Sequence, residues 1–179
     1  MSTRARVIVT IAVVIAVGGG AALYWFQPWR LFTNSTVQET LPSAAPSSSL
    51  GTSAAPSPQP PQNVLLATGT LISHEHESRG SVRLIRLADG RTQLTLEGLA
   101  TSDGPDLHVW LTDQPVRPGR DGWFVFDDGR YIELGPLKAN NGDQVYDVPA
   151  GTDLTGIISV TIWCKRFSVS FGAAPLNPA

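Results

Sequence analysis

An unbroken run of uncharged residues near the amino terminus, Val7 to Phe26, limits what this chain can fold into more than any other feature. A helix of about 20 apolar residues rises about 30 Å, which is the thickness of the hydrocarbon core of a bilayer. Arg4 and Arg6 precede the run and only Arg30 follows it closely, so the positive-inside tendency places the amino terminus in the cytoplasm. The run therefore predicts a transmembrane signal-anchor helix, preceded by a cytoplasmic terminus of residues 1–6.

The same run is compatible with a cleaved signal peptide, because Gly20-Ala21-Ala22 could serve as a small-residue cleavage site. The apolar region of such a peptide is usually shorter, and the bulky residues Tyr24, Trp25 and Phe26 follow at once, which favours an anchor. Both interpretations export the rest of the chain. We therefore expect a single span in the cell membrane, with the C-terminal part of the chain outside the cytoplasm.

Residues 27–63 are expected to form a disordered stalk rich in Pro, Ser and Ala. Between Thr33 and Asn63 there are seven serines and six prolines, and Glu39 is the only charged residue. Such a segment cannot bury enough apolar surface to offset the entropy of ordering it. We expect the stalk to hold the following domain roughly 3 nm from the bilayer as a coil, and up to ~9 nm away when extended.

From Val64 to Ala179 the pattern changes to short runs rich in β-branched and aromatic residues, separated by turn residues. No window has a period of 3.6 residues, and Asp89-Gly90 is a strong hairpin turn. We therefore expect an all-β fold, with a single antiparallel β-sandwich or barrel-like domain over residues 64–179. The expected strands cover residues 65–72, 81–87, 93–99, 107–111, 123–126, 131–134, 144–148, 157–164 and 168–172.

Composition excludes several classes of function for this domain. It carries ten Lys and Arg against fourteen Asp and Glu, a net charge of −4, which argues against nucleic acid as a partner. The single cysteine excludes an intramolecular disulfide. The chain has no nucleophile elbow, phosphate-binding loop or dinucleotide fingerprint, so no hydrolase or transferase is indicated. Whether the chain is an enzyme stays open, with a redox role beside a partner as one option.

Four stretches of the domain form a set of motifs. They are Gly104-Pro105-Asp106-Leu107 with the strand His108-Val109-Trp110-Leu111, Leu134 to Lys138 leading to Gly142-Asp143-Gln144 and Tyr146, Pro149 with Leu154, and Val160-Thr161-Ile162-Trp163-Cys164 with Phe167, Phe171-Gly172, Ala174 and Leu176. In this order, over residues 69–176, they resemble the electron-transfer DM-thirteen domain family, whose signature cysteine matches Cys164. The resemblance implies an extracellular β-sandwich-like domain, a role in electron transfer, and a cysteine that is a free thiol or a metal ligand. In animals the family is fused to haem-binding DOMON and b-type cytochrome modules, so a redox role here requires a partner that supplies electrons.

The residues around Cys164 support more than one role for it. Lys165 and Arg166 follow directly, and nearby cations stabilise the reactive thiolate, while Trp163 could contact a bound group. However, Cys164 shares strand parity with Ile162, which points it toward the core as a small hydrophobic residue. A redox thiol, a metal ligand, a buried core residue and an intermolecular disulfide all stay open.

Three histidines complete the candidate metal ligands. His74 and His76 are two residues apart after a strand, so they lie on one side of an extended segment and could hold copper or zinc if Cys164 or His108 approaches. The alternatives are a polar surface turn for the first two and a hydrogen-bonded structural histidine for the third. No cofactor is required by the sequence, and copper, zinc or a haem supplied by a partner are the options.

The remaining motifs favour structure over chemistry. Gly104-Pro105-Asp106 is typical of a turn, and Gly142-Asp143-Gln144 is expected to shape one as well. Trp123-Phe124-Val125-Phe126 would put bulky groups on both faces of one strand, so it is either covered on both sides or exposes a ring as a binding surface.

Two functions follow from these observations. The first is a membrane-anchored, extracytoplasmic redox or electron-transfer module centred on Cys164. The second is a non-catalytic module that binds a ligand or a protein at the cell surface. An accessible Cys164 close to a histidine would favour the first, and a buried Cys164 with an exposed Trp123 or Phe124 would favour the second.

Overall fold

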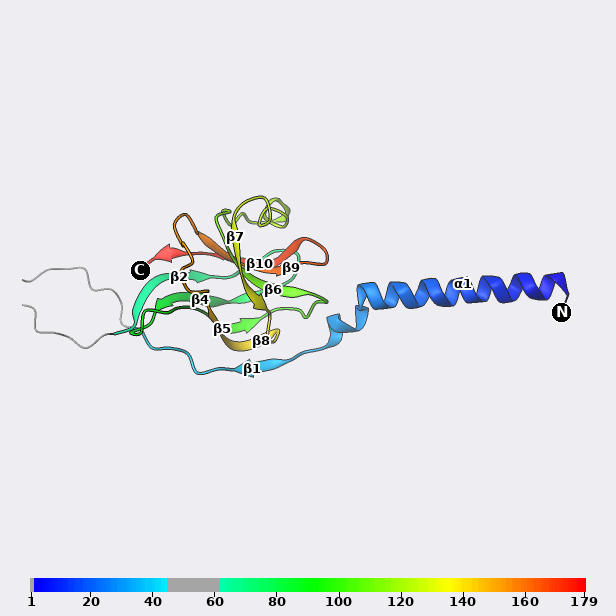
Figure 1. Ribbon diagram of the computed structural model, residues 1–179, viewed down its shortest axis with the longest axis horizontal. Helices are drawn as coiled ribbons and strands as arrows, with labels where there is room; N and C mark the ends of the chain where they lie inside the picture. The colour runs from blue at the N-terminus through cyan, green and yellow to red at the C-terminus, as the bar shows by residue number, and fades with distance from the viewer. Residues whose placement is uncertain (1, 45–61) are drawn as a thin grey trace, which may run out of the picture.

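The computed structural model describes residues 2–44 and 62–179. A long apolar helix leads into a β-sandwich (Figure 1). The predicted fold class is therefore confirmed. The part of the predicted disordered stalk that covers residues 45–61 lies outside the described residues.

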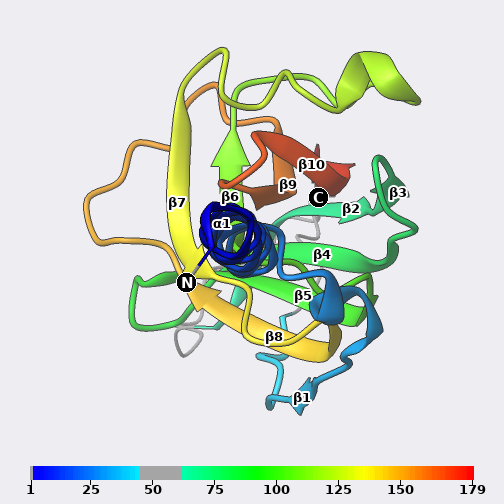
Figure 2. The ribbon, with the colours of Figure 1, turned by 90° about the vertical axis from the view of Figure 1, so that its right-hand side faces the viewer.

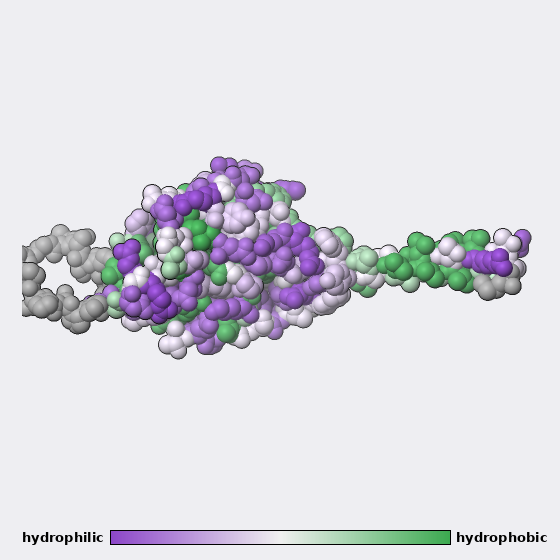
Figure 3. Space-filling view, in the orientation of Figure 1, coloured by the Kyte–Doolittle hydropathy of each residue, from purple (hydrophilic) through white to green (hydrophobic). Residues whose placement is uncertain are grey.

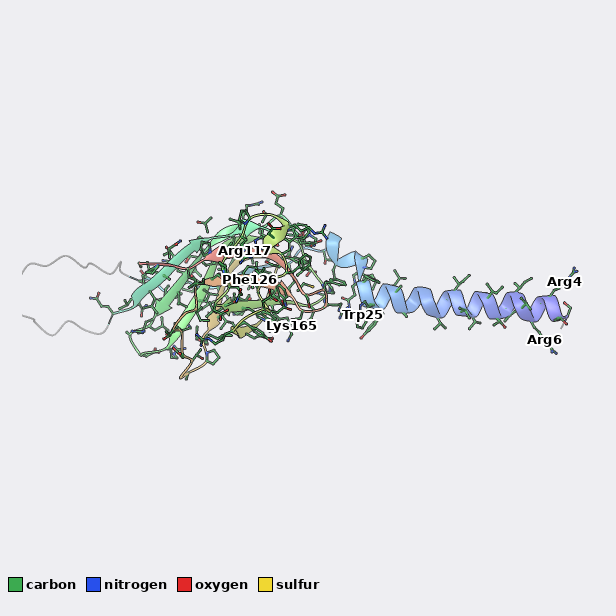
Figure 4. The ribbon with its side chains drawn as sticks, turned by 90° about the horizontal axis from the view of Figure 1, so that it is seen from above. Arg4, Arg6, Trp25, Arg117, Phe126 and Lys165 are labelled. Carbon is green, nitrogen blue, oxygen red and sulfur yellow. The ribbon has the colours of Figure 1, made fainter. Side chains whose placement is uncertain are left out.

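Helix α1 runs from Thr3 to Phe26, and none of its residues is buried. It ends at Gln27, which has a left-handed backbone (φ +44°) and is followed by the short 3-10 helix η1 (Pro28–Phe32). Of the described residues, this N-terminal helix is the one segment long and apolar enough to cross a membrane. Its surface is mostly hydrophobic (Figure 3), and Arg4 and Arg6 lie at the end remote from the sandwich (Figure 4).

Two sheets pack face to face around a shared core. The larger has the strand order β1-β8-β5-β4-β2-β11 and the smaller has the order β3-β10-β9-β6-β7. All neighbours are antiparallel except β1, which pairs parallel to β8. The strands are β1 (Thr36–Gln38), β2 (Val64–Thr70), β3 (Ile72–Ser73), β4 (Arg79–Arg86), β5 (Thr92–Ala100), β6 (Leu107–Thr112), β7 (Tyr131–Pro136), β8 (Asn141–Asp147), β9 (Ser159–Cys164), β10 (Val169–Pro175) and β11 (Asn177–Pro178).

The alternation of side chains along the strands places the main core between the sheets. Val82 and Leu84 of β4 are buried opposite Leu96 and Leu94 of β5, their register partners. Each such buried side chain contributes about 1.5–3 kcal/mol by leaving water. The hairpin that joins these strands turns at Asp89-Gly90, where Gly90 has a φ of +89°, as the sequence predicts.

The smaller sheet is covered on its outer face as well. All six residues of β9 are buried, because a second apolar cluster of Trp110, Phe126, Trp163 and Ala173 lies on the side away from the main core. The loop between β6 and β7 supplies Phe126 to this cluster. A strand buried on both faces loses the polar alternation that an exposed face would show.

The predicted strand over residues 123–126 is wrong, because this segment is part of that covering loop. It follows the 3-10 turn η2 (Arg120–Gly122). In place of a ladder, its backbone forms local turn bonds and one bond to β10, in which Ser170 N donates to Trp123 O over 2.8 Å. Trp123 N donates to Arg120 O over 3.1 Å and Asp128 N donates to Val125 O over 3.2 Å. Loop geometry lets the segment bury Phe126 completely while Phe124 stays 47 % exposed.

The first part of the predicted stalk is docked on the sandwich, contrary to expectation. Residues 33–44, which we call the strap, run along the larger sheet and contribute its edge strand β1, so the sandwich includes residues before Val64 (Figure 1). Lys138 Nζ lies 2.7 Å from the carboxylate of Glu39, which also accepts the N–H of Val145. These hydrogen bonds and the ion pair offset the entropy that is lost when the strap becomes ordered, which the composition of the strap alone cannot do.

The end of α1 meets the sandwich directly. The rings of Phe26 and Phe167 stack with their centroids 6.0 Å apart, and the guanidinium of Arg166 donates to Trp25 O over 2.7 Å. Viewed along α1, the helix lies in front of the sandwich and β1 lies at its outer edge (Figure 2). The described chain therefore shows no spacing of several nanometres between helix and domain.

Candidate functional site

Cys164 lies at the end of β9, where the chain turns toward α1. Its register partners are Val169 of β10 and Leu107 of β6, and its side chain is fully buried in the main core. Burial raises the pKa of the thiol, although the backbone N–H groups of Phe167 and Arg166 donate to the sulfur and act in the opposite direction. The thiol is therefore protonated at neutral pH and closed to solvent.

The cations next to Cys164 point elsewhere. Lys165 Nζ lies 3.1 Å from the carboxylate of Glu133, and Arg166 reaches the end of α1. Side chains adjacent on a strand point to opposite faces, so the ammonium group of Lys165 is directed away from the thiol. In this geometry Lys165 is paired with Glu133 and does not provide the predicted stabilisation of a thiolate.

The three histidines occupy three different environments. His74 is buried between Ser170 Oγ (2.8 Å) and Arg117 O (3.1 Å), and burial lowers the pKa of its imidazole. His76 lies over the ring of Phe171 with centroids 4.0 Å apart. Arg117 and Phe126, which also neighbour the His74 ring, both come from the loop between β6 and β7, and Figure 4 labels them on the domain.

His108 lies on the outer face of the smaller sheet, where Asp106 Oδ1 is 3.1 Å from its Nε2 and Glu133 Oε1 is 2.7 Å from its Nδ1. Its register partner is Trp163, so it points away from the face that carries Cys164. Within residues 2–44 and 62–179, no three His, Cys, Asp or Glu side chains are grouped so that they could hold a metal ion. The predicted ligands Cys164, His74, His76 and His108 are thus not brought together in one site.

The motif Gly104-Pro105-Asp106 forms a turn at the end of the sandwich that faces α1. Asp103 accepts the N–H of Gly104 (2.8 Å) and the hydroxyl of Thr33 (2.7 Å), and Arg30 reaches the same carboxylate over 3.5 Å. A Cβ on Gly104 would lie 2.9 Å from the tip of the Phe171 ring, so a larger residue here would require that ring to shift. This turn joins the segment after α1 to the domain.

The second motif fixes the β7–β8 connection and the strap. Gln144 donates to Ala139 O (2.6 Å) and accepts the hydroxyl of Tyr146 (2.7 Å), and burial raises the pKa of Tyr146 to about 12. Asp143 accepts the N–H of Gly98 over 2.7 Å. Gly142 has a φ of +102°, and a Cβ there would collide with the strap. The polar residues of this motif are therefore engaged in structural contacts.

Trp163, which precedes Cys164, belongs to the outer cluster. Its ring stacks on Trp110 (5.3 Å between centroids), and Trp110 in turn stacks on the exposed Tyr131 (4.0 Å). Phe126 meets Trp163 edge-on at 6.3 Å. This packing buries the indole of Trp163 almost completely, so it leaves no face for the predicted contact with a bound group.

A cavity of about 490 Å³ opens where the sandwich meets α1. We call it the aromatic pocket, and it is lined by the rings of Phe26, His76, Trp123, Phe124, Phe167 and Phe171, with Arg30, Glu75 and Asp103 as charged members. Its volume is within the range of small-molecule sites, roughly 300–1,000 Å³. Cys164 does not line it, but its register partner Val169 and the nearby Phe167 do.

Only one part of the aromatic pocket could be predicted from the sequence. The bulky Trp123-Phe124 pair signalled an exposed ring, and Phe124 is indeed 47 % exposed. The other lining residues come from four separate segments, including the end of α1, and their convergence depends on the docking of the helix end. No local pattern marks such a site.

Comparison with known proteins agrees with the motifs. The family model described as Electron transfer DM13 matches residues 70–176, which is more than half of the chain. No curated protein and no solved structure matches. The match spans Cys164, the turn before β6 and the second motif, so this chain belongs to the Electron transfer DM13 family.

Proposed function

We propose that this chain is a membrane-anchored electron-transfer protein whose β-sandwich lies outside the cytoplasm. α1 is the anchor, and the excess of arginine at its remote end keeps that end in the cytoplasm. The domain exchanges electrons with a redox partner in or at the cell membrane. Membership in an electron-transfer family supports this general role.

The observation that carries the proposal is the direct contact between the β9–β10 turn and the end of α1. This turn carries Arg166 and Phe167, which touch Trp25 and Phe26, and it begins at Cys164. Figure 4 shows Trp25 and Lys165 at the junction of helix and domain. In a membrane, this contact would hold the cysteine at the end of the domain nearest the lipid.

Cys164 is the group of this chain that we propose takes part in the exchange. The backbone N–H groups of Phe167 and Arg166 act to lower the pKa of its thiol, so they would stabilise negative charge on the sulfur as it forms. Desolvation opposes that charge, and a reaction at the sulfur requires movement of the residues 165–168 turn or of the pocket wall. The thiol is thereby protected from indiscriminate oxidation.

Reversible oxidation of Cys164 tests the proposal. The full chain in lipid nanodiscs is treated with hydrogen peroxide, which would convert the thiol to a sulfenic acid and release water. Intact mass should rise by one oxygen atom at Cys164 and return to its initial value after a thiol reductant. Cys164→Ala controls for oxidation of Met1, the only methionine. A thiol that stays unchanged until the protein is denatured would reject Cys164 as the redox group.

A second function, binding without a redox step, is favoured by a specific observation. Cys164 is fully enclosed while Phe124 is exposed beside the aromatic pocket. This is the combination that favours a binding module. If Cys164 proves inert, the pocket would be the working site and the cysteine a core residue.

A further inference from the structure

We propose that the aromatic pocket binds the ring of a membrane quinone, meaning a lipid with a neutral, planar ring, carbonyl oxygens and an apolar tail. The inference rests on the proposed electron-transfer function, for which it names the ligand class. It concerns binding and adds no electron-transfer step of its own.

The location of the pocket is the first argument. Phe26, the last residue of α1, lines it, and Gln27, Pro28 and Arg30 continue the lining just beyond the helix. With α1 as the anchor, the aromatic run Tyr24 to Phe26 lies at the lipid–water interface. A lipid whose tail stays in the bilayer can therefore place its head in the pocket.

The second argument is the lining. Six rings surround the cavity, and three of them, Phe26, Phe124 and Phe167, are 60 %, 47 % and 40 % exposed. Aromatic rings prefer offset or edge-on contacts with centroids about 4.5–7 Å apart, a geometry that a planar ligand ring can adopt between them. Apolar side chains left this open to water are typical of a binding surface.

The charges of the pocket select against an anionic head group. Glu75 and Asp103 are two carboxylates, and Arg30 is the one permanently charged cation among the lining residues, lying 3.5 Å from Asp103. A phosphate or a fatty-acid carboxylate would meet an excess of negative charge, whereas a neutral ring would not. This favours a quinone over a phospholipid or a fatty acid.

The polar atoms of the pocket suit carbonyl oxygens. The indole N–H of Trp123 is buried and has no hydrogen-bond partner among the described residues. A buried donor without a partner is costly, and an acceptor oxygen on a ligand would satisfy it once the indole turns toward the cavity, because the nitrogen itself is closed to solvent. His76 Nε2 is already paired with the carboxylate of Glu75. The guanidinium of Arg30, which also reaches Asp103 and Gly104 O, is a further donor in the same lining.

The test uses the full chain in nanodiscs and a short-tailed quinone, decylubiquinone, as the probe. Binding is measured by equilibrium partition against empty nanodiscs of the same lipid. Phe124→Ala should weaken binding about tenfold, which corresponds to ~1.4 kcal/mol, and Trp123→Phe should weaken it by about 2- to 10-fold, because it keeps a ring but removes one N–H. Ile158→Ala, a similarly exposed apolar position outside the pocket, should leave binding unchanged.

Two outcomes would overturn the proposal. One is quinone uptake that equals the uptake by empty nanodiscs or is the same for Phe124→Ala and Ile158→Ala. The other is equally tight binding of decanol, which would show that the pocket accepts any apolar tail. The peroxide assay on the wild-type chain separates this inference from the proposed function: quinone binding by a chain whose Cys164 resists oxidation would retain the pocket and reject the thiol.

Discussion

Replacing Gly142 by alanine should release the strap from the sandwich. Gly142 has a φ of +102°, and a Cβ at this position would collide with the carbonyl oxygen of Val37 in β1. Gly135 offers a matched control, since it also lies in a strand with a positive φ (+125°) but a Cβ there would meet nothing within 4 Å. Both substitutions strain the backbone, and only Gly142→Ala obstructs the strap.

The expected magnitude follows from the bonds that the strap makes. A residue with an unfavourable backbone conformation costs about 1–3 kcal/mol, and this cost is common to both variants. Gly142→Ala also loses the backbone bonds Asn141 N to Ser35 O (3.1 Å) and Glu39 N to Asp143 O (3.0 Å). At about 0.5–1.5 kcal/mol each, these add about 1–3 kcal/mol, or a roughly 5- to 150-fold loss of protection in the strap.

Hydrogen exchange followed by mass spectrometry measures this directly in the full chain in detergent. Amides in peptides that cover residues 33–44 should exchange faster in Gly142→Ala than in Gly135→Ala, and the global free energy of unfolding should fall by about 1–3 kcal/mol more in Gly142→Ala. Equal strap protection in the two variants would refute the reasoning. It would mean that β8 moves to accommodate the new methyl group and that β1 stays paired.

Three further predictions concern stability. The hydrogen bond from Lys138 lowers the pKa of Glu39 below its ordinary value of 4.5. The ionised carboxylate therefore stabilises the folded chain above pH 4.5, and this contribution is lost as the pH falls through the pKa of Glu39 in the folded state. The melting temperatures of wild type and Glu39→Gln should converge in acid. Burial lowers the pKa of His74 below 6.5, so wild type should lose stability from pH 7 to 5 more steeply than His74→Gln, and parallel pH profiles would contradict this. Phe126→Ala should lower the free energy of unfolding in urea by about 3–5 kcal/mol, whereas Phe124→Ala should change it by less than ~0.5 kcal/mol; equal losses would place Phe124 in the core.

Much of the fold could be predicted because the relevant signals are local. The strand that contains Val82 and Leu84 shows period-two alternation, and the Asp89-Gly90 turn has the residues that a tight hairpin requires. The strand at Trp123 was predicted wrongly for a physical reason. Bulky residues in a row indicate burial on two sides, but a loop that folds over a sheet achieves the same burial as a strand.

The candidate site was less predictable than the fold. The motifs around Cys164 and Gly142 identify the family from the sequence, whereas the environment of each residue depends on partners far away in the chain. Cys164 is buried because it lies between Leu107 and Val169 of the neighbouring strands. Position 142 requires a glycine because Val37 passes beside it. Spacing along the chain contains no information about these approaches.

The sequence by itself determined the apolar helix, the all-β class and the family, since each depends on hydropathy, periodicity or residue identity within a short window. Only the tertiary structure decided that the strap pairs with β8, that Phe26 meets Phe167 and that an aromatic pocket forms between them. A segment of low hydrophobicity becomes ordered when partners elsewhere supply hydrogen bonds and opposite charge. Those partners, Lys138 and Asn140 among them, lie about a hundred residues away from the strap in the sequence.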